Sequence, residues 1–252
     1  HNENINPKYF NVQKILRICK RYSDLIAGLK LRISAEIATD SQTTSFDALR
    51  RGIEIAQRCG LPLSVHMPNF QGELSGLIDI LRPGDIFCHV YTPQKGILED
   101  GSVSEEMKRA VQKGIILESA CGKGHFGHEC AGKAIQAGIE PNIISGDFTK
   151  NTHHFEPAVS LPYLMSRFLG LGLSFEKVLS CCTTEPAKQM GMEGKIGCLK
   201  TGAFANIAVL ERRQKDIVFV DVKGKEVRGN ELIIPVMTIL EGEPVYRNMS
   251  AF

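Results

Sequence analysis

The chain has 252 residues, of which 43% are hydrophobic, so it can bury a full core in one large domain with a smaller appendage. Its formal net charge is +2 without long basic runs, which argues against nucleic-acid and membrane partners. Eight cysteines without a CxxC pair are interpreted as reduced thiols of a cytoplasmic protein. We expect a small-molecule substrate and a homo-oligomer.

Helix-like and strand-like segments alternate through the first three quarters of the chain. Helices are predicted at residues 11–21, from Ser45 to Gly60, and at 74–81, 104–113, 129–137, 161–170 and 175–182. Strands are predicted at residues 25–34, 61–66, 86–89, 115–119 and 142–147. This alternation predicts a parallel sheet, and in barrel folds the C-terminal strand ends build the active site.

The last part of the chain has a different character. From Lys195 onward, short β segments are separated by glycines, notably at residues 205–210, 217–222 and 226–227. We therefore predict two domains, an α/β domain over residues 1–194 and a small C-terminal β-domain over residues 195–252.

Four of the five predicted strands carry a side chain that can bind a metal: Lys30, His66, His89 and Asp147. A hydrolytic metal site needs such ligands from several strands around one pocket, so that water becomes a nucleophile near neutral pH. Each histidine alone fits a hydrogen-bonded core residue equally well, and Asp147 alone fits a helix-capping carboxylate. Together they occupy equivalent ends of successive strand–helix units, which favours a shared metal site.

Lys30 is the exceptional member of this set. An ammonium group repels metal ions and is costly to bury between Leu29 and Leu31. A desolvated lysine, however, has a lowered pKa and becomes nucleophilic. It can then react with carbon dioxide to give a carbamate, which would turn Lys30 into a carboxylate-like ligand.

Several short motifs occur in an order that matches a known family. They are GLKLRIS at residues 28–34, VH at 65–66, CH at 88–89, GKG at 122–124 and SGD at 145–147. The match continues through LP at 161–162, MSRFL at 165–169, TEPA at 184–187 and GA at 202–203. In this order and spacing the chain resembles the amidohydrolase superfamily, in particular its deacetylase and dihydroorotase-like branch.

The resemblance implies a binuclear, zinc-type site in a (β/α)8 barrel of the TIM type. Lys30, as its carbamate, would bridge the two metal ions, and His66 and His89 would bind one of them. Asp147 would bind the other and act as general base and proton shuttle. A bridging hydroxide would attack the metal-polarised amide carbonyl.

The chain departs from the family pattern at the first strand. That strand normally carries a His-x-His pair for the metal shared with Asp147, and no His-x-His occurs in this chain. Lys30 matches the family's fourth strand. We therefore expect strands 4–8 of the barrel to be present, the first three to be missing, and the chain to be a truncated form.

Three further residues are candidates for substrate binding. Lys123 and His125 follow the fourth predicted strand in a glycine-rich loop, where they can offer a cation and a second donor to a substrate carboxylate. A flexible loop with a solvated lysine is an equal alternative. Asn69 lies three residues beyond His66 and either contacts substrate or holds a turn.

Three functions remain open on this basis. The first is metal-dependent hydrolysis of a small N-acyl amino or hydroxy acid, such as an N-acetyl compound. The second is cyclic-amide hydrolysis of the dihydroorotase kind, which uses the same metal chemistry. The third is a truncated, inactive barrel that serves as a scaffold, because resemblance of fold does not prove activity.

Overall fold

The computed structural model describes residues 5–37, 44–150, 152, 156 and 159–249. Four parallel strands form the central sheet in the order β1-β2-β3-β6. Their bounds are Leu29–Arg32 (β1), Leu63–His66 (β2), Ile86–Cys88 (β3) and Ile116–Glu118 (β6). The prediction of an α/β protein with a parallel sheet is confirmed.

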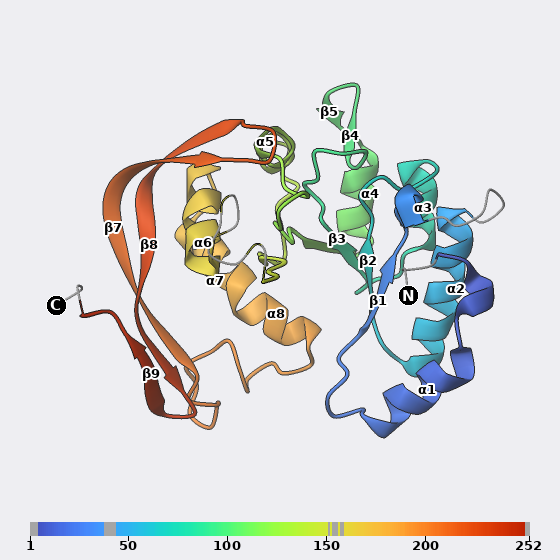
Figure 1. Cartoon of the computed structure of the whole chain (residues 1–252), viewed down its shortest axis with the longest axis horizontal. Coiled ribbons are helices and arrows are strands. Elements are labelled where there is room, and N and C mark those ends of the chain that lie inside the picture. The colour runs from blue at the N-terminus through green and yellow to red at the C-terminus, as the bar shows by residue number, and fades with distance from the viewer. Residues whose placement is uncertain (1–4, 38–43, 151, 153–155, 157–158, 250–252) are drawn as a thin grey trace.

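Helices connect the strands and lie on both sides of the sheet. Helices α1 to α4 lie on one side, and α6 to α8 lie on the other (Figure 1). The predicted helices at residues 161–170 and 175–182 are confirmed at both ends. The helices are Val12–Arg21 (α1), Ser45–Cys59 (α2), Leu74–Ile80 (α3), Glu106–Gln112 (α4), His128–Gln136 (α5), Leu161–Gly170 (α6), Phe175–Cys182 (α7) and Thr184–Gln189 (α8). Short elements complete this part, namely the 3-10 turns Pro7–Tyr9 and Ala35–Ile37 and the strands Leu98–Glu99 (β4) and Ser102–Val103 (β5).

The start of α2 shows how local chemistry sets a helix boundary. Thr44 is the N-cap and forms a capping box with Asp47, whose N–H donates to Thr44 Oγ1 at 3.2 Å. The sequence also offers Ser45 as an N-cap, which is wrong, because Ser45 Oγ donates to Ile33 O at 2.6 Å and so ties the helix to the end of β1. Gly60 ends the helix at φ +67°, a conformation that glycine adopts without strain.

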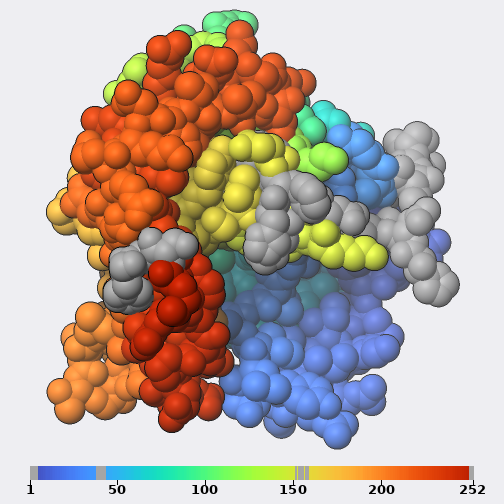
Figure 2. Space-filling model, turned by 60° about the vertical axis from the view of Figure 1, so that its left-hand side comes forward, coloured from blue at the N-terminus to red at the C-terminus, as the bar shows by residue number. Residues whose placement is uncertain are grey.

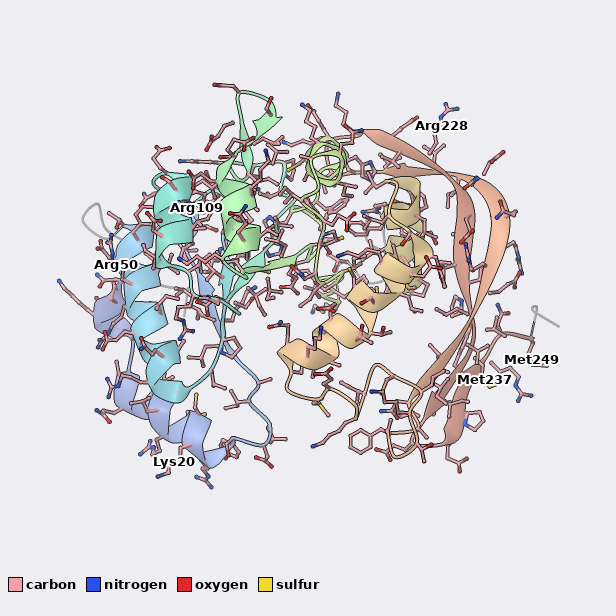
Figure 3. The ribbon with its side chains drawn as sticks, turned by 180° about the vertical axis from the view of Figure 1, so that it is seen from behind. Lys20, Arg50, Arg109, Arg228, Met237 and Met249 are labelled. Carbon is pink, nitrogen blue, oxygen red and sulfur yellow. The ribbon has the colours of Figure 1, made fainter. Side chains whose placement is uncertain are left out.

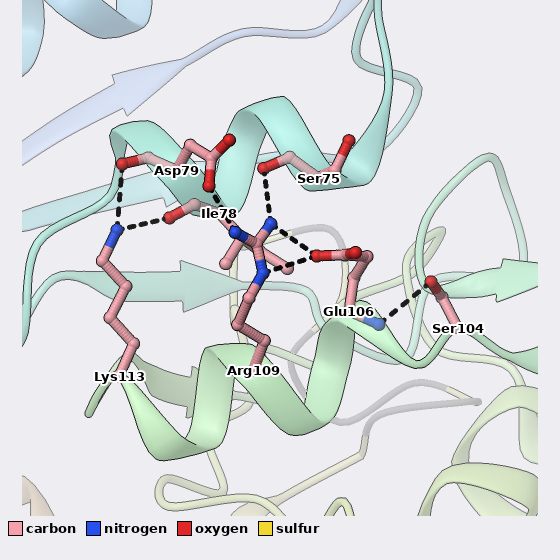
Figure 4. Close-up of polar contacts among 7 residues, drawn as sticks. All are labelled: Ser75, Ile78, Asp79, Ser104, Glu106, Arg109 and Lys113. Atoms are coloured by element: carbon pink, nitrogen blue, oxygen red, sulfur yellow. Dashed lines mark hydrogen bonds and ion pairs between the residues drawn. The ribbon is translucent and has the colours of Figure 1, made fainter.

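Charged side chains of α4 hold it against α3 (Figure 4). Arg109 donates from Nη2 to Ser75 O at 3.1 Å and pairs with Asp79. Lys113 donates from Nζ to Ile78 O at 2.7 Å and to Asp79 O at 2.9 Å. These two carbonyls belong to the last turn of α3, where the helix itself offers no partner. We call Arg109 and Lys113 with these partners the α3–α4 clamp.

Residues 142–147 do not form the fifth strand that the sequence predicts. Within the described chain, the segment makes one isolated parallel bridge, from Ile143 to Glu118. Asn142 interrupts the ladder, because its side-chain Oδ1 accepts the N–H of Leu117 at 2.8 Å. The segment still runs beside the chain that follows β6, where two backbone hydrogen bonds of 2.9 Å join residues 121 and 122 to residues 145 and 146.

The C-terminal part forms an antiparallel sheet in the order β7-β8-β9. Its strands are Ile207–Val220 (β7), Glu226–Leu240 (β8) and Glu243–Arg247 (β9). β7 has 14 residues and β8 has 15, so the predicted short segments are wrong in length. The two strands pair along their length despite register shifts, one of which lies between Gln214 and Ile217. From the sequence alone, such a shift looks like the end of a strand.

This sheet packs directly on α5 and α6, as Figure 2 shows for the orange strands beside the yellow helix. The N–H of Ile233 on β8 donates to Ser166 Oγ on α6 at 2.8 Å. Asp221 Oδ2 accepts the N–H of His128, the first residue of α5, at 2.7 Å. One cluster of buried side chains reaches from Phe87 on β3 to Ile233. The division into two domains at residue 194 stays a prediction.

The outer helices and the C-terminal sheet lie at opposite sides of the molecule. Figure 3 shows Lys20, Arg50 and Arg109 on the helical side and Arg228 and Met237 on the side of the sheet. Among the described residues, no helix has both the length and the apolar character that crossing a membrane requires.

Candidate metal centre

Two neighbouring strands lead to histidines. His66 is the last residue of β2, and His89 directly follows β3. Because β2 and β3 pair in parallel with His66 opposite Cys88, both imidazoles emerge at the same end of the sheet, and their ring centroids lie 4.4 Å apart. His89 has φ +64°, a left-handed conformation that is strained for a residue other than glycine. Strain of this kind clusters at functional positions.

The loop between β6 and α5 brings a third histidine to this pair. The ring centroid of His125 lies 4.9 Å from that of His66 and 4.5 Å from that of His89. One ring nitrogen from each residue lies within 4.8 Å of the other two, an arrangement that can hold a metal ion. We call His66, His89 and His125 the histidine cluster. In the described residues, it is the only group of three His, Cys, Asp or Glu side chains this close together.

Hydrogen bonding leaves the cluster with free ligand atoms. His89 Nδ1 lies 2.8 Å from Ala120 O, and a carbonyl oxygen only accepts, so Nδ1 carries the proton and Nε2 keeps its lone pair. Among the described residues, His66 Nε2 and His125 Nδ1 are buried and have no hydrogen-bond partner. Buried polar atoms are nearly always paired, and a bound ion is one of the few explanations for an exception.

The electrostatics of the cluster favour neutral imidazoles. Burial first, and the neighbouring histidines second, lower the pKa of His66 and of His89 to about 3. Burial also lowers the pKa of His125, against the opposing effect of the Asp147 carboxylate. Neutral rings are the form in which histidine binds a metal.

Lys30 lies beside the cluster and not within it. Its Nζ donates to Ser64 Oγ at 3.3 Å and to Cys88 Sγ at 2.9 Å. Its side chain is exposed, so the expectation of a desolvated lysine is wrong for the described chain. In the described chain, β1 lies at the edge of the sheet and has a neighbouring strand on one side only. The positive charge of Lys30 still acts on the cluster, where it helps to lower the pKa values of His66 and His89.

Asp147 lies close enough to His125 for the two groups to interact electrostatically. A Cβ at Gly122 would lie 2.7 Å from Asp147 Oδ2, so the carboxylate fits there only because residue 122 is glycine. Asp147 is exposed and has φ +47°. Partial burial raises the pKa of its carboxyl group, and the charges of His125 and Lys30 oppose that rise. The structure thus places both predicted partners of the histidines within electrostatic reach of them.

Comparisons with known proteins give this geometry a family context. The model of the amidohydrolase family matches residues 166–246. A deacetylase of Brucella anthropi is 27% identical over 242 residues, which cover 94% of this chain and 58% of that protein. Deacetylase Atu3266 of Agrobacterium fabrum is 28% identical with the same coverage. The chain therefore spans a little over half the length of the curated relatives it matches.

Solved structures agree over nearly the whole chain. A dihydroorotase is 26% identical with a TM-score of 0.84, covering 96% of this chain and 63% of that one. The chain is an amidohydrolase-superfamily protein, deacetylase- and dihydroorotase-like. An adenine deaminase, 21% identical, shares the fold of this amidohydrolase-superfamily chain with a TM-score of 0.89, covering 96% of it and 66% of the deaminase.

The predicted substrate-binding residues separate in the amidohydrolase-superfamily structure. Lys123 is exposed in the loop that carries His125, while the ring of His125 turns into the histidine cluster. Asn69 has φ +57°, and its N–H donates to Lys95 O at 3.0 Å. Its side-chain Nδ2 donates to Glu36 Oε1 at 2.7 Å. Asn69 thus holds a turn, one of its two predicted roles, and contact with substrate stays a prediction.

Two charged residues near the cluster lie outside the predicted set. Arg32 pairs with His66 in the register of β1 and β2, and Glu36 follows β1 in a 3-10 turn. Both act electrostatically on His66 and His125. Burial works to raise the pKa of Glu36, but the hydrogen bond from Asn69 and the charge of Arg32 leave it lowered. The sequence contains a signal for Arg32, because it lies two residues after Lys30 on the same strand. Side chains two residues apart on a strand point to the same face of the sheet.

A separate cavity of about 620 Å³ opens on the inner face of the sheet. Lys30, Ser64 and Glu118 line it from the sheet, and Leu161 and Met190 line it from the helices opposite. None of the three clustered histidines lines this space. The histidine cluster therefore lies outside this cavity.

Proposed function

We propose that this chain is the metal-binding part of a hydrolase that cleaves the amide bond of a small N-acyl amino or hydroxy acid. The histidine cluster carries the proposal, because three neutral imidazoles meet within 4.8 Å at the strand ends where an enzyme of this class needs its metal. The two relatives named as deacetylases support an acyl amide as the bond that is cleaved.

The residues present fit a divalent metal ion, most simply zinc. Buried imidazole nitrogens without hydrogen-bond partners are suitable zinc ligands. The Ala120 carbonyl that holds His89 Nδ1 also fixes the orientation of the ring and leaves Nε2 available as a ligand. An ion bound there would polarise an amide carbonyl and make water more acidic.

Asp147 is the candidate general base and proton shuttle. Its exposed carboxylate lies over Gly122 beside His125, where it can take a proton from water and deliver it to the leaving nitrogen. Lys123 in the same loop can attract a substrate carboxylate. Lys30 is assigned as a carbamate by resemblance alone, and its exposed ammonium would first have to release Ser64 and Cys88.

Cyclic-amide hydrolysis is the second candidate, favoured by the 26% identity to a dihydroorotase. The wider assignments also stay predictions. They are strands 4–8 of a (β/α)8 barrel, the domain division at residue 194, a homo-oligomer, a cytoplasmic location and the alternative of an inactive scaffold.

The test is hydrolysis by the zinc-loaded chain. N-acetyl amino and hydroxy acids would be followed by acetate release, and dihydroorotate and hydantoins by loss of ultraviolet absorbance. We expect acetate release that a chelator abolishes and zinc restores. His66→Ala should be inactive, while His128→Ala, the removal of a buried histidine outside the cluster, should keep activity in the folded fraction. Turnover of cyclic amides alone would favour the second candidate, and turnover of neither would leave the scaffold.

A further inference from the structure

We propose that His125 is the third ligand of a one-ion site, so that His66, His89 and His125 hold a single metal ion without a bridging Lys30. This inference rests on the proposed function only for the presence of a metal at the cluster, and it does not require hydrolysis. It gives His125 a role different from the predicted contact with substrate.

The spacing of the three rings is close to what one ion needs. In a tetrahedral zinc site with Zn–N bonds of about 2.0–2.1 Å, ligand nitrogens lie about 3.3 Å apart. The cluster has all three nitrogens within 4.8 Å, so modest side-chain rotations would bring them to an ion. A site of three histidines leaves a fourth position open, which is typical of catalytic zinc.

The unpaired atoms point to the same conclusion. His66 Nε2 and His125 Nδ1 are both buried and have no partner in the part of the chain that the structure describes. If His125 served only as a donor to substrate, its buried Nδ1 would have no reason to lie among two other imidazoles. An ion between the rings would satisfy the unpaired nitrogens of His66 and His125 together with the free Nε2 of His89.

The backbone on both sides of His125 holds it in place. Before it, the N–H of Gly122 donates to Gly146 O at 2.9 Å, and after it the N–H of Gly127 donates to Tyr91 O at 2.9 Å. Phe126 is buried, with its ring centroid 5.4 Å from that of Phe168. His125 is therefore anchored at both ends, as a metal ligand must be.

Lys30 is engaged elsewhere. Its Nζ donates to Ser64 and Cys88, and its side chain is exposed at the sheet edge. Two ions close together need bridging anions to offset their repulsion. One ion held by three imidazoles needs no such bridge, so the cluster can assemble with Lys30 left as it is.

Metal binding by the metal-free chain tests the inference. Zinc affinity would be measured by competition with a chromophoric chelator, and cobalt(II) would report coordination through its visible absorption. We expect one ion per chain. His125→Ala should lower zinc affinity by more than about 100-fold, beyond the usual loss for a residue that only orients a ligand, and should change the cobalt spectrum. Lys30→Ala should change neither beyond about threefold.

His128→Ala is the matched control, since it removes a buried histidine that bonds to Lys225 O outside the cluster. Circular dichroism and urea unfolding of the metal-free variants would separate misfolding from loss of a ligand. Unchanged zinc affinity in His125→Ala, loss of the ion in Lys30→Ala, or two tightly held ions per chain would each overturn the inference. One His125-dependent ion without hydrolysis would overturn the proposed function and leave the site standing.

Discussion

The α3–α4 clamp and the histidine cluster both consist of polar side chains, but they differ in hydrogen bonding. The side chains of the clamp have hydrogen-bond partners, whereas two nitrogens of the cluster have none in the described chain. In the clamp, Arg109 donates to a carbonyl group in the first turn of α3, and Lys113 donates to two carbonyl groups in its last turn. In the cluster, His66 Nε2 and His125 Nδ1 are buried and find no partner among the residues that the structure describes. A buried unsatisfied polar atom costs about 1–3 kcal/mol. The clamp thus stabilises the helical layer, whereas the cluster gives up stability at the place where we propose a metal.

The largest effect should come from removing a histidine of the cluster. In His89→Ala we expect zinc affinity and hydrolysis to fall by more than about 1,000-fold, because the ion supplies several kcal/mol of transition-state stabilisation. The metal-free protein should lose only about 1 kcal/mol, the worth of the bond to Ala120 O. Zinc titration, acetate release and urea unfolding measure these quantities. Wild-type zinc affinity in the variant would place the metal elsewhere.

Asp147 separates proton transfer from metal binding. Asp147→Asn should lower hydrolysis by about 100- to 10,000-fold, the usual worth of a general base, and should leave zinc affinity within a few-fold of wild type. Asp100→Asn is a matched control, because Asp100 is another exposed aspartate at positive φ, in the turn between β4 and β5. Equal activity of the two variants would remove Asp147 from the mechanism.

The buried hydroxyl of Ser166 joins α6 to β8, and its removal measures what a hydrogen bond in the core contributes to stability. Ser166→Ala leaves the N–H of Ile233 without its acceptor, so the free energy of unfolding should fall by about 1–3 kcal/mol. Zinc affinity of the folded protein should not change. Ser102→Ala on exposed β5 should leave stability within about 0.5 kcal/mol of wild type. If Ser166→Ala lost no more stability than Ser102→Ala, a water would be replacing the hydroxyl.

Asp221 predicts a dependence of stability on pH. Burial would raise its pKa, but backbone N–H groups of His128, Lys225 and Lys223 outweigh burial and leave the pKa lowered. The stabilisation is therefore complete above the ordinary value of 3.8 and is lost as the pH falls through the lower folded-state value. Below about pH 4, the unfolding free energy of wild type should fall more steeply than that of Asp221→Asn. Parallel pH profiles from urea unfolding would contradict this.

The smallest effect should come from the clamp. Lys113→Met keeps the alkyl stem but loses both bonds to the last turn of α3, so the unfolding free energy should fall by about 0.3–1 kcal/mol. Zinc binding should be unaffected. Lys108→Met, at an exposed lysine on the same helix, should have less effect on stability. A change in zinc affinity with Lys113→Met would show that the two regions are coupled.

The sequence by itself determined the features that depend on neighbours in the chain. The helix-like pattern of residues 161–170 and 175–182 placed α6 and α7 at their observed bounds, and Gly60 marked the end of α2. The alternation of strands and helices gave the parallel sheet. The sequence also placed His66 and His89 close together, because both lie at the ends of successive strands and adjacent parallel strands end at the same edge of the sheet.

Only the tertiary structure decided what depends on residues far apart in the chain. Lys30 is exposed because β1 lies at the edge of the sheet, and residues 142–147 lack a full ladder because Asn142 takes the N–H of Leu117. β7 and β8 are long because each supplies hydrogen-bond partners to the other. His125 joins the cluster because Gly146 and Tyr91 hold its loop from either side. These outcomes depend on long-range pairing and packing, which no local pattern of residues encodes.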